Sequence, residues 1–138
     1  MRLREFPARL AAGAFILHSG LDKWRGDEAT AQAVHGMAAG AYPVLKSVPP
    51  TQFLRYLAAS EIAIGGGLLT PFVPASLAGA ALTGFSGALM GLYARTPGMR
   101  KEGSVWPTRQ GTAISKDVWL LGIGLALLAD AWSTGRSA

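Results

Sequence analysis

The sequence has no cysteine and few charged residues. The absence of cysteine excludes disulfide bonds, thiol redox chemistry and thiolate metal sites. Only 15% of the 138 residues are charged, whereas a soluble domain usually carries about 25%. A chain this apolar has too little polar surface to cover a water-soluble globule. The composition therefore favours a single-domain membrane protein.

The sequence also lacks the short motifs that mark common catalytic sites. There is no nucleophile motif, P-loop or dinucleotide fingerprint, and no histidine or acidic spacing typical of a metal site. We therefore predict no catalytic residue and no metal, and the chain is more readily explained without enzymatic activity of its own. The net charge of +5 does not indicate nucleic-acid binding, because the basic residues lie between apolar segments rather than in one stripe. Anionic lipid headgroups are the simpler partner.

Four apolar segments predict an all-α fold. They cover residues 7–23, 51–72, 75–94 and 114–132 and predict one domain formed by a four-helix transmembrane bundle, a multi-pass protein of the cell membrane. The clearest span, 75–94, has 20 residues without a charge. The first is the weakest, since its helix would be only about 25 Å long. In the connection before residue 51, Asp27, Glu28 and Thr30 predict the start of a short interfacial helix.

Antiparallel spans would gather most internal charges at one end of such a bundle. The connections after the first and third spans lie on the same side, so side chains near them should converge there. Glu61 would lie about 15 Å into the second span from that side. The predicted polar site comprises His18, Asp22, Lys23, Glu61, Arg95, Lys116 and Asp117.

Glu61 is the strongest candidate within this group. A carboxylate in hydrocarbon is costly when ionised, so it should face the bundle interior and be paired or protonated. One interpretation is a proton or ligand site with His18 or Lys23 as partner. The other is a structural ion pair that fixes the second span against a neighbour. The sequence leaves both open.

Two further features predict packing rather than chemistry. Arg9 and Asp130, at the opposite end of the bundle, predict a structural ion pair. Gly84, Gly87 and Gly91 lie along the third span, and the last two have GxxxG spacing. We interpret that glycine face as helix packing within one chain in preference to dimerisation.

The ordered segments resemble the DoxX-like family of small membrane proteins. The resemblance is carried by Arg9–Phe15 leading to Ser19–Lys23, by Glu61 followed by Gly65–Leu69, and by Lys116–Gly122. It implies a four-helix membrane bundle associated with redox systems, and the composition resembles that of actinobacterial proteins. The connection at residues 22–50 is longer than is usual for the family.

Two functions follow as hypotheses. The resemblance implies a non-catalytic subunit or anchor of a redox-linked membrane complex, with membrane or redox proteins as partners. The alternative is a small-molecule or quinone-associated protein, or a small carrier, in which Glu61 handles a proton; a carrier of this size would need to form a homo-oligomer. The orientation also stays open. The connections carry nine Lys/Arg against four on the side of the termini, but Arg2, Arg4 and Arg9 beside the first span favour the reverse.

Overall fold

The computed structural model describes residues 2–136, and within that range the chain is helical with no strand. An isolated bridge between Arg100 and Pro107 is the one extended pairing among these residues. The all-α prediction is thereby confirmed. The long helices are α1 (Phe6–Trp24), α3 (Pro50–Leu69), α4 (Ala75–Arg95) and α6 (Val118–Arg136); the short elements are η1 (Leu3–Glu5), α2 (Glu28–Ala41), η2 (Pro43–Ser47) and α5 (Thr112–Ser115).

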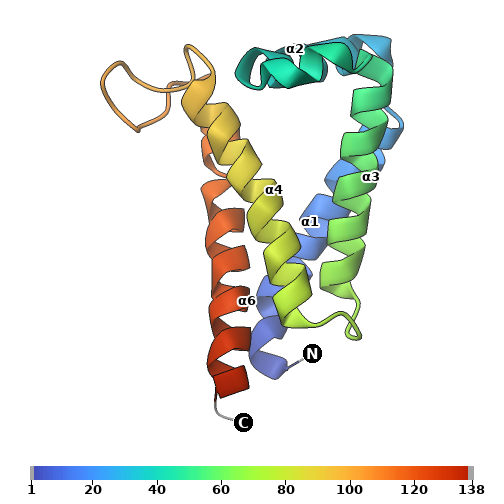
Figure 1. The fold of residues 1–138 in the computed structure, drawn as a ribbon, viewed down its shortest axis with the longest axis vertical. Helices are drawn as coiled ribbons and strands as arrows, with labels where there is room; N and C mark the ends of the chain where they lie inside the picture. The colour runs from blue at the N-terminus through green and yellow to red at the C-terminus, as the bar shows by residue number, and fades with distance from the viewer. Residues whose placement is uncertain (1, 137–138) are drawn as a thin grey trace.

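The long helices form two closely packed pairs. One pair is α1 with α3 and the other is α4 with α6, while contacts between the pairs are sparse. The pairs meet near the chain termini and diverge toward the other end, where α2 lies across the gap (Figure 1). The arrangement of the four long helices is therefore open at one end and closed at the other.

Glycines allow α1 and α3 to approach backbone to backbone. A Cβ atom at Gly65 would lie 2.6 Å from the backbone nitrogen of Leu17 and 2.9 Å from the carbonyl oxygen of Gly13. One at Gly20 would lie 2.9 Å from the Cβ of Glu61. Small residues are needed wherever helix backbones come this close.

A second glycine contact joins α4 to α6, and it is not the one predicted. A Cβ at Gly79 would lie 3.0 Å from the carbonyl oxygen of Gly124. By contrast, a Cβ at Gly84 or Gly87 would meet nothing within 4 Å, and Gly91 faces the hydroxyl of Tyr42 rather than a helix. The predicted packing face at Gly84, Gly87 and Gly91 is therefore wrong, because the face of α4 that packs against α6 carries Gly79.

The core lies where the two pairs converge. Ile16, Leu68 and Leu82 are almost fully buried and contact one another through a cluster that includes Leu120 and Leu127 of α6. Toward the α2 end this cluster gives way to open space between the pairs. The packed core therefore lies toward the closed end of the molecule, which is the end that carries the termini.

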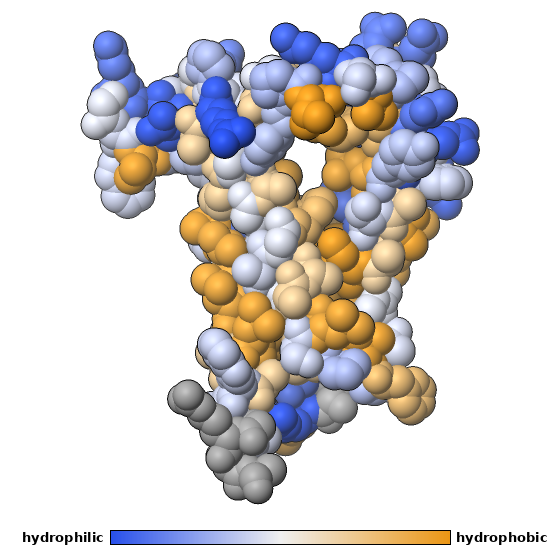
Figure 2. All heavy atoms as spheres, viewed as in Figure 1, coloured by the Kyte–Doolittle hydropathy of each residue, from blue (hydrophilic) through white to orange (hydrophobic). Residues whose placement is uncertain are grey.

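The outer surface is apolar along the middle of the molecule and polar toward its ends (Figure 2). Two segments are long and apolar enough to cross a membrane by length and composition, Ala75–Arg95 and Thr112–Thr134. Leu77 and Leu125 on these segments are large, apolar and exposed. Helices α1 and α3 are less apolar because α1 carries Arg9, Asp22 and Lys23, and α3 carries Arg55 and Glu61. Of these charged residues, Arg9 and Glu61 are buried.

The predicted short helix in the first connection is confirmed as α2. Asp27 is its N-cap and accepts a hydrogen bond from the Thr30 backbone N–H at 2.8 Å. Two predicted boundaries shift. Helix α3 ends at Leu69 because Thr70 adopts an extended backbone before Pro71. The last segment is broken into α5 and α6 at Lys116 and Asp117.

Candidate functional site

A cavity of about 550 Å³ lies between the helix pairs, beneath α2. Figure 2 shows part of this hollow as an opening below α2. We call it the central cavity. Its walls are mainly aliphatic and aromatic, and its polar lining comes from few residues. It is lined by side chains that include Phe15, Ile16, Ser19, Lys23, Met37, Tyr42, Phe53, Leu57, Glu61, Phe85, Leu89, Asp117 and Leu120.

An ion pair forms the polar part of one wall. Lys23 Nζ lies 3.1 Å from Glu61 Oε1 and 3.2 Å from Oε2, and it also donates to Ser19 Oγ at 2.7 Å. Glu61 is buried and Lys23 is partly buried. One turn of α1 brings Ser19 and Lys23 onto the same face, and the glycine contact at Gly20 draws that face against α3. The pair thus links α1 to α3 and faces the cavity at the same time.

Asp117 lies on the other side of the central cavity, at the start of α6. It is partly buried and close enough to Lys23 and Glu61 for their charges to act on it. Within residues 2–136, its carboxylate has neither a hydrogen bond nor an ion pair. The cavity therefore exposes one paired carboxylate and one carboxylate that has no protein partner.

The structure divides the predicted polar site into residues that meet and residues that do not. Lys23, Glu61 and Asp117 line the central cavity together. Arg95 is exposed at the end of α4, where its guanidinium lies 5.1 Å from the centre of the Tyr42 ring. The remaining members are exposed and lie outside the cavity lining: His18, Asp22 and Lys116.

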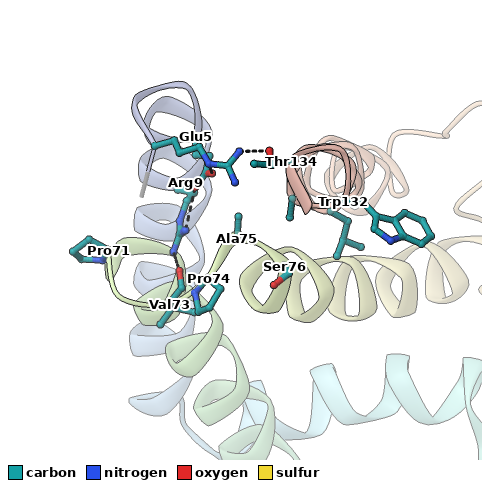
Figure 3. A pocket seen from close by; sticks show the side chains of 12 residues that line it. Glu5, Arg9, Pro71, Val73, Pro74, Ala75, Ser76, Trp132 and Thr134 are labelled. Carbon is teal, nitrogen blue, oxygen red and sulfur yellow. Dashed lines mark hydrogen bonds and ion pairs between the residues drawn. The ribbon is translucent and has the colours of Figure 1, made fainter. Parts of the chain in front are cut away.

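The opposite end of the molecule is organised by Arg9, whose side chain is 1% exposed. Its Nε donates to the Leu68 carbonyl at 2.9 Å, and one terminal nitrogen donates to the carbonyls of Gly67, Thr70 and Val73. These acceptors are carbonyls at the C-terminal end of α3 and in the turn to α4. Arg9 thereby satisfies acceptors that a helix end leaves unpaired. Figure 3 shows it reaching from α1 to this turn.

The predicted pairing of Arg9 with Asp130 is corrected. The acid beside Arg9 is Glu5, and Arg9 Nη1 lies 3.5 Å from Glu5 Oε2. Asp130 instead pairs with Arg4 at 2.7 Å and with Arg2 at 3.3 Å. Glu5, which sequence reasoning missed, is buried. Its spacing of four residues from Arg9 was the signal that could have identified it.

A second, more open cavity of about 770 Å³ lies beside this network. It is bordered by Arg2, Ser76, Trp132 and Thr134 among others (Figure 3). Its charged groups are already paired, because Arg2 contacts Glu5 and Asp130. The ion pair between Arg2 and Asp130 links the segment before α1 to α6.

No group of three or more histidine, cysteine or acidic residues within residues 2–136 could hold a metal ion. Comparison of the chain with protein-family models, with curated proteins and with solved structures gives no match. The central cavity is therefore the feature of this chain that indicates a function.

Proposed function

We propose that this chain is a multi-pass membrane protein that binds a small, largely apolar molecule in the central cavity. The observation that carries the proposal is the combination of an apolar cavity of about 550 Å³ with an ion pair and a separate carboxylate in its walls. Ligand sites are commonly mostly apolar hollows of this size with a few polar groups that orient the ligand.

Four membrane crossings are supported by length and by the surface. Helices α1 and α3 have 19 and 20 residues, which gives about 30 Å at 1.5 Å per residue, close to the thickness of a hydrocarbon core. Leu10 on α1 is exposed, like the leucines on α4 and α6. Trp119 and Trp132 are exposed near opposite ends of α6, where aromatic side chains favour the two membrane interfaces.

The open arrangement of the pairs supports access from the bilayer. An apolar molecule dissolved in lipid could enter between the helix pairs, while α2 covers the cavity at the interface. Quinones are one class of such molecules, and the Lys23–Glu61 pair supplies a hydrogen-bond donor and a carboxylate that can exchange a proton. We therefore favour a small-molecule or quinone-associated protein over a non-catalytic subunit of a redox-linked complex.

The test is binding to the protein reconstituted in phosphatidylcholine nanodiscs. The probes are decylubiquinone and 1-adamantanol, with binding to empty nanodiscs subtracted. Leu57 lines the cavity, so Leu57→Trp should fill it and abolish binding. Leu77→Trp, on the exposed face of α4, is the matched control and should bind as the unchanged protein does. Failure of both probes to bind, or equal binding by Leu57→Trp, would reject the proposal.

A membrane subunit of a redox-linked complex, as implied by the DoxX-like resemblance, is the second candidate. It is supported by Gly84 and Gly87, which are exposed on α4 with open space beside them and could accept a closely packed helix. Purification in mild detergent should then yield a stoichiometric partner, or a second copy, that is lost on Gly87→Leu. Recovery of the protein alone and monomeric would count against this candidate.

A further inference from the structure

The charges that line the central cavity do not cancel. Lys23 carries one positive charge, whereas Glu61 and Asp117 carry two negative charges when both are ionised. The ammonium is engaged by Glu61 at 3.1 Å and by Ser19 at 2.7 Å. When Asp117 is ionised, the lining of the cavity therefore has an excess of one negative charge.

Nearby basic residues do not remove this excess. Every lysine and arginine side chain at this end of the molecule other than Lys23 is exposed, including Lys116 and Arg95. The guanidinium of Arg95 lies over the Tyr42 ring and points to the Ala41 carbonyl, 3.5 Å away. Water and ions screen exposed charges strongly, so neither residue substitutes for a partner inside the cavity.

An unpaired carboxylate beside apolar walls is unfavourable unless a proton or a cation joins it. A metal ion is not indicated, because no group of three or more acidic or histidine ligands occurs within residues 2–136. An organic cation is better suited, because Phe15, Phe53 and Phe85 line the same space. Aromatic faces attract organic cations, and the apolar walls favour the hydrocarbon part of such a molecule.

Building on the proposed function, we infer that the ligand of the central cavity is an amphipathic organic cation. Its ammonium group would lie between Asp117 and the Lys23–Glu61 pair, nearer to Asp117, and its hydrocarbon body would contact the aromatic and aliphatic walls. Binding would supply the positive charge that the cavity lacks. A quinone of the same size would fill the space but leave that carboxylate unpaired.

Three probes of one shape and different charge test this inference. They are 1-adamantanamine, which is cationic near neutral pH, 1-adamantanol, which is neutral, and 1-adamantanecarboxylate, which is anionic. Binding is measured by equilibrium dialysis against the protein in phosphatidylcholine nanodiscs. We expect the amine to bind about tenfold more tightly than the alcohol, and the carboxylate to bind most weakly.

Variants assign the preference to one carboxylate. Asp117→Asn, which keeps the size of the side chain, should remove most of the preference for the amine while leaving the alcohol bound. Asp117→Glu should retain the preference. Asp22→Asn removes a charge from an exposed position at the same end of the molecule and should change nothing. Thermal unfolding of each variant verifies that it is folded.

The outcomes separate this inference from the proposed function. If amine and alcohol bind equally well and Leu57→Trp abolishes both, the cavity binds ligands but the inference is wrong. If the carboxylate binds most tightly, Lys23 governs selectivity and the inference is again wrong. If no probe binds, or Leu57→Trp has no effect, the proposed function fails as well.

Discussion

Lys23 Nζ lies within 3.2 Å of both carboxylate oxygens of Glu61, yet the two side chains differ in exposure. The Glu61 side chain is 7% exposed and that of Lys23 is 26% exposed. Water can therefore compensate for a missing partner at Lys23 better than at Glu61. This asymmetry predicts unequal effects when either member of the pair is removed.

We expect Lys23→Met to destabilise the protein more than Glu61→Gln does. Loss of the lysine leaves a buried carboxylate without its cation, at a cost of about 2 kcal/mol after allowance for partial exposure. Loss of the carboxylate leaves a lysine that can still reach water. The measurement is the free energy of unfolding in mixed micelles. In the double variant Lys23→Met with Glu61→Gln, the loss should be smaller than the sum of the two single losses, and additive losses would show that the two residues are not coupled.

Arg9→Lys should be more damaging than its conservative chemistry suggests. A lysine has three donors on one nitrogen and cannot reproduce the guanidinium bonds to Leu68, Gly67 and Val73. Buried carbonyls left unpaired should lower the free energy of unfolding by about 3 kcal/mol. The control is Arg4→Lys, since Arg4 is 60% exposed and pairs with Asp130. A change at Arg9 as small as the control's would contradict the capping role.

Two adjacent glycines in α3 should respond oppositely to alanine. Gly65→Ala places a methyl group 2.6 Å from the Leu17 backbone and should cost about 1–3 kcal/mol. At Gly66 a Cβ would meet nothing within 4 Å, so Gly66→Ala should be neutral or slightly stabilising through helix propensity. Unfolding of both variants, measured side by side, tests the close approach of α1 and α3.

Acidification should loosen the first turn of α2. The hydrogen bond from the Thr30 backbone N–H lowers the pKa of Asp27 below its ordinary value. A lowered folded-state pKa gives stability that is present above the unfolded-state pKa and is lost as the pH falls through the folded-state value. Amide exchange at residues 28–31, corrected for intrinsic rates, should therefore rise as the pH falls below 3.8, the ordinary pKa of aspartate. In Asp27→Asn, which keeps a capping side chain that does not titrate, the rise should be absent.

The termini should lie outside the cytoplasm if the chain crosses the membrane four times. Nine of the 13 Lys/Arg belong to the side of the connections and four to the side of the termini. The positive-inside rule, which counts Lys and Arg, therefore places the connections in the cytoplasm. A C-terminal alkaline phosphatase fusion should be active and a fluorescent-protein fusion dark; the reverse pattern would overturn this orientation.

The sequence predicted the helical elements because their signals are local. Apolar length indicated the long helices, and Asp27 with Thr30 marked the start of α2. The grouping of Lys23, Glu61 and Asp117 at one end also followed from the alternation of helix direction, and all three line one cavity. His18 was predicted at the same site but does not line the cavity, because its side chain lies on the exposed face of α1. Depth along a helix was predictable, whereas the side a residue faces depends on which helices become neighbours.

The sequence by itself determined that this chain is helical, apolar and poor in conventional catalytic motifs. Only the tertiary structure decided that its long helices form two pairs. That pairing depends on close backbone contacts at Gly65 and Gly79, and the sequence does not distinguish these two glycines from the others in the chain. That pairing also decided that Arg9 caps α3 instead of meeting Asp130. It left Asp117 without a partner among the described residues, beside a paired Glu61. The physical reason is that composition sets how much surface must be buried, while helix packing sets which charges are buried together.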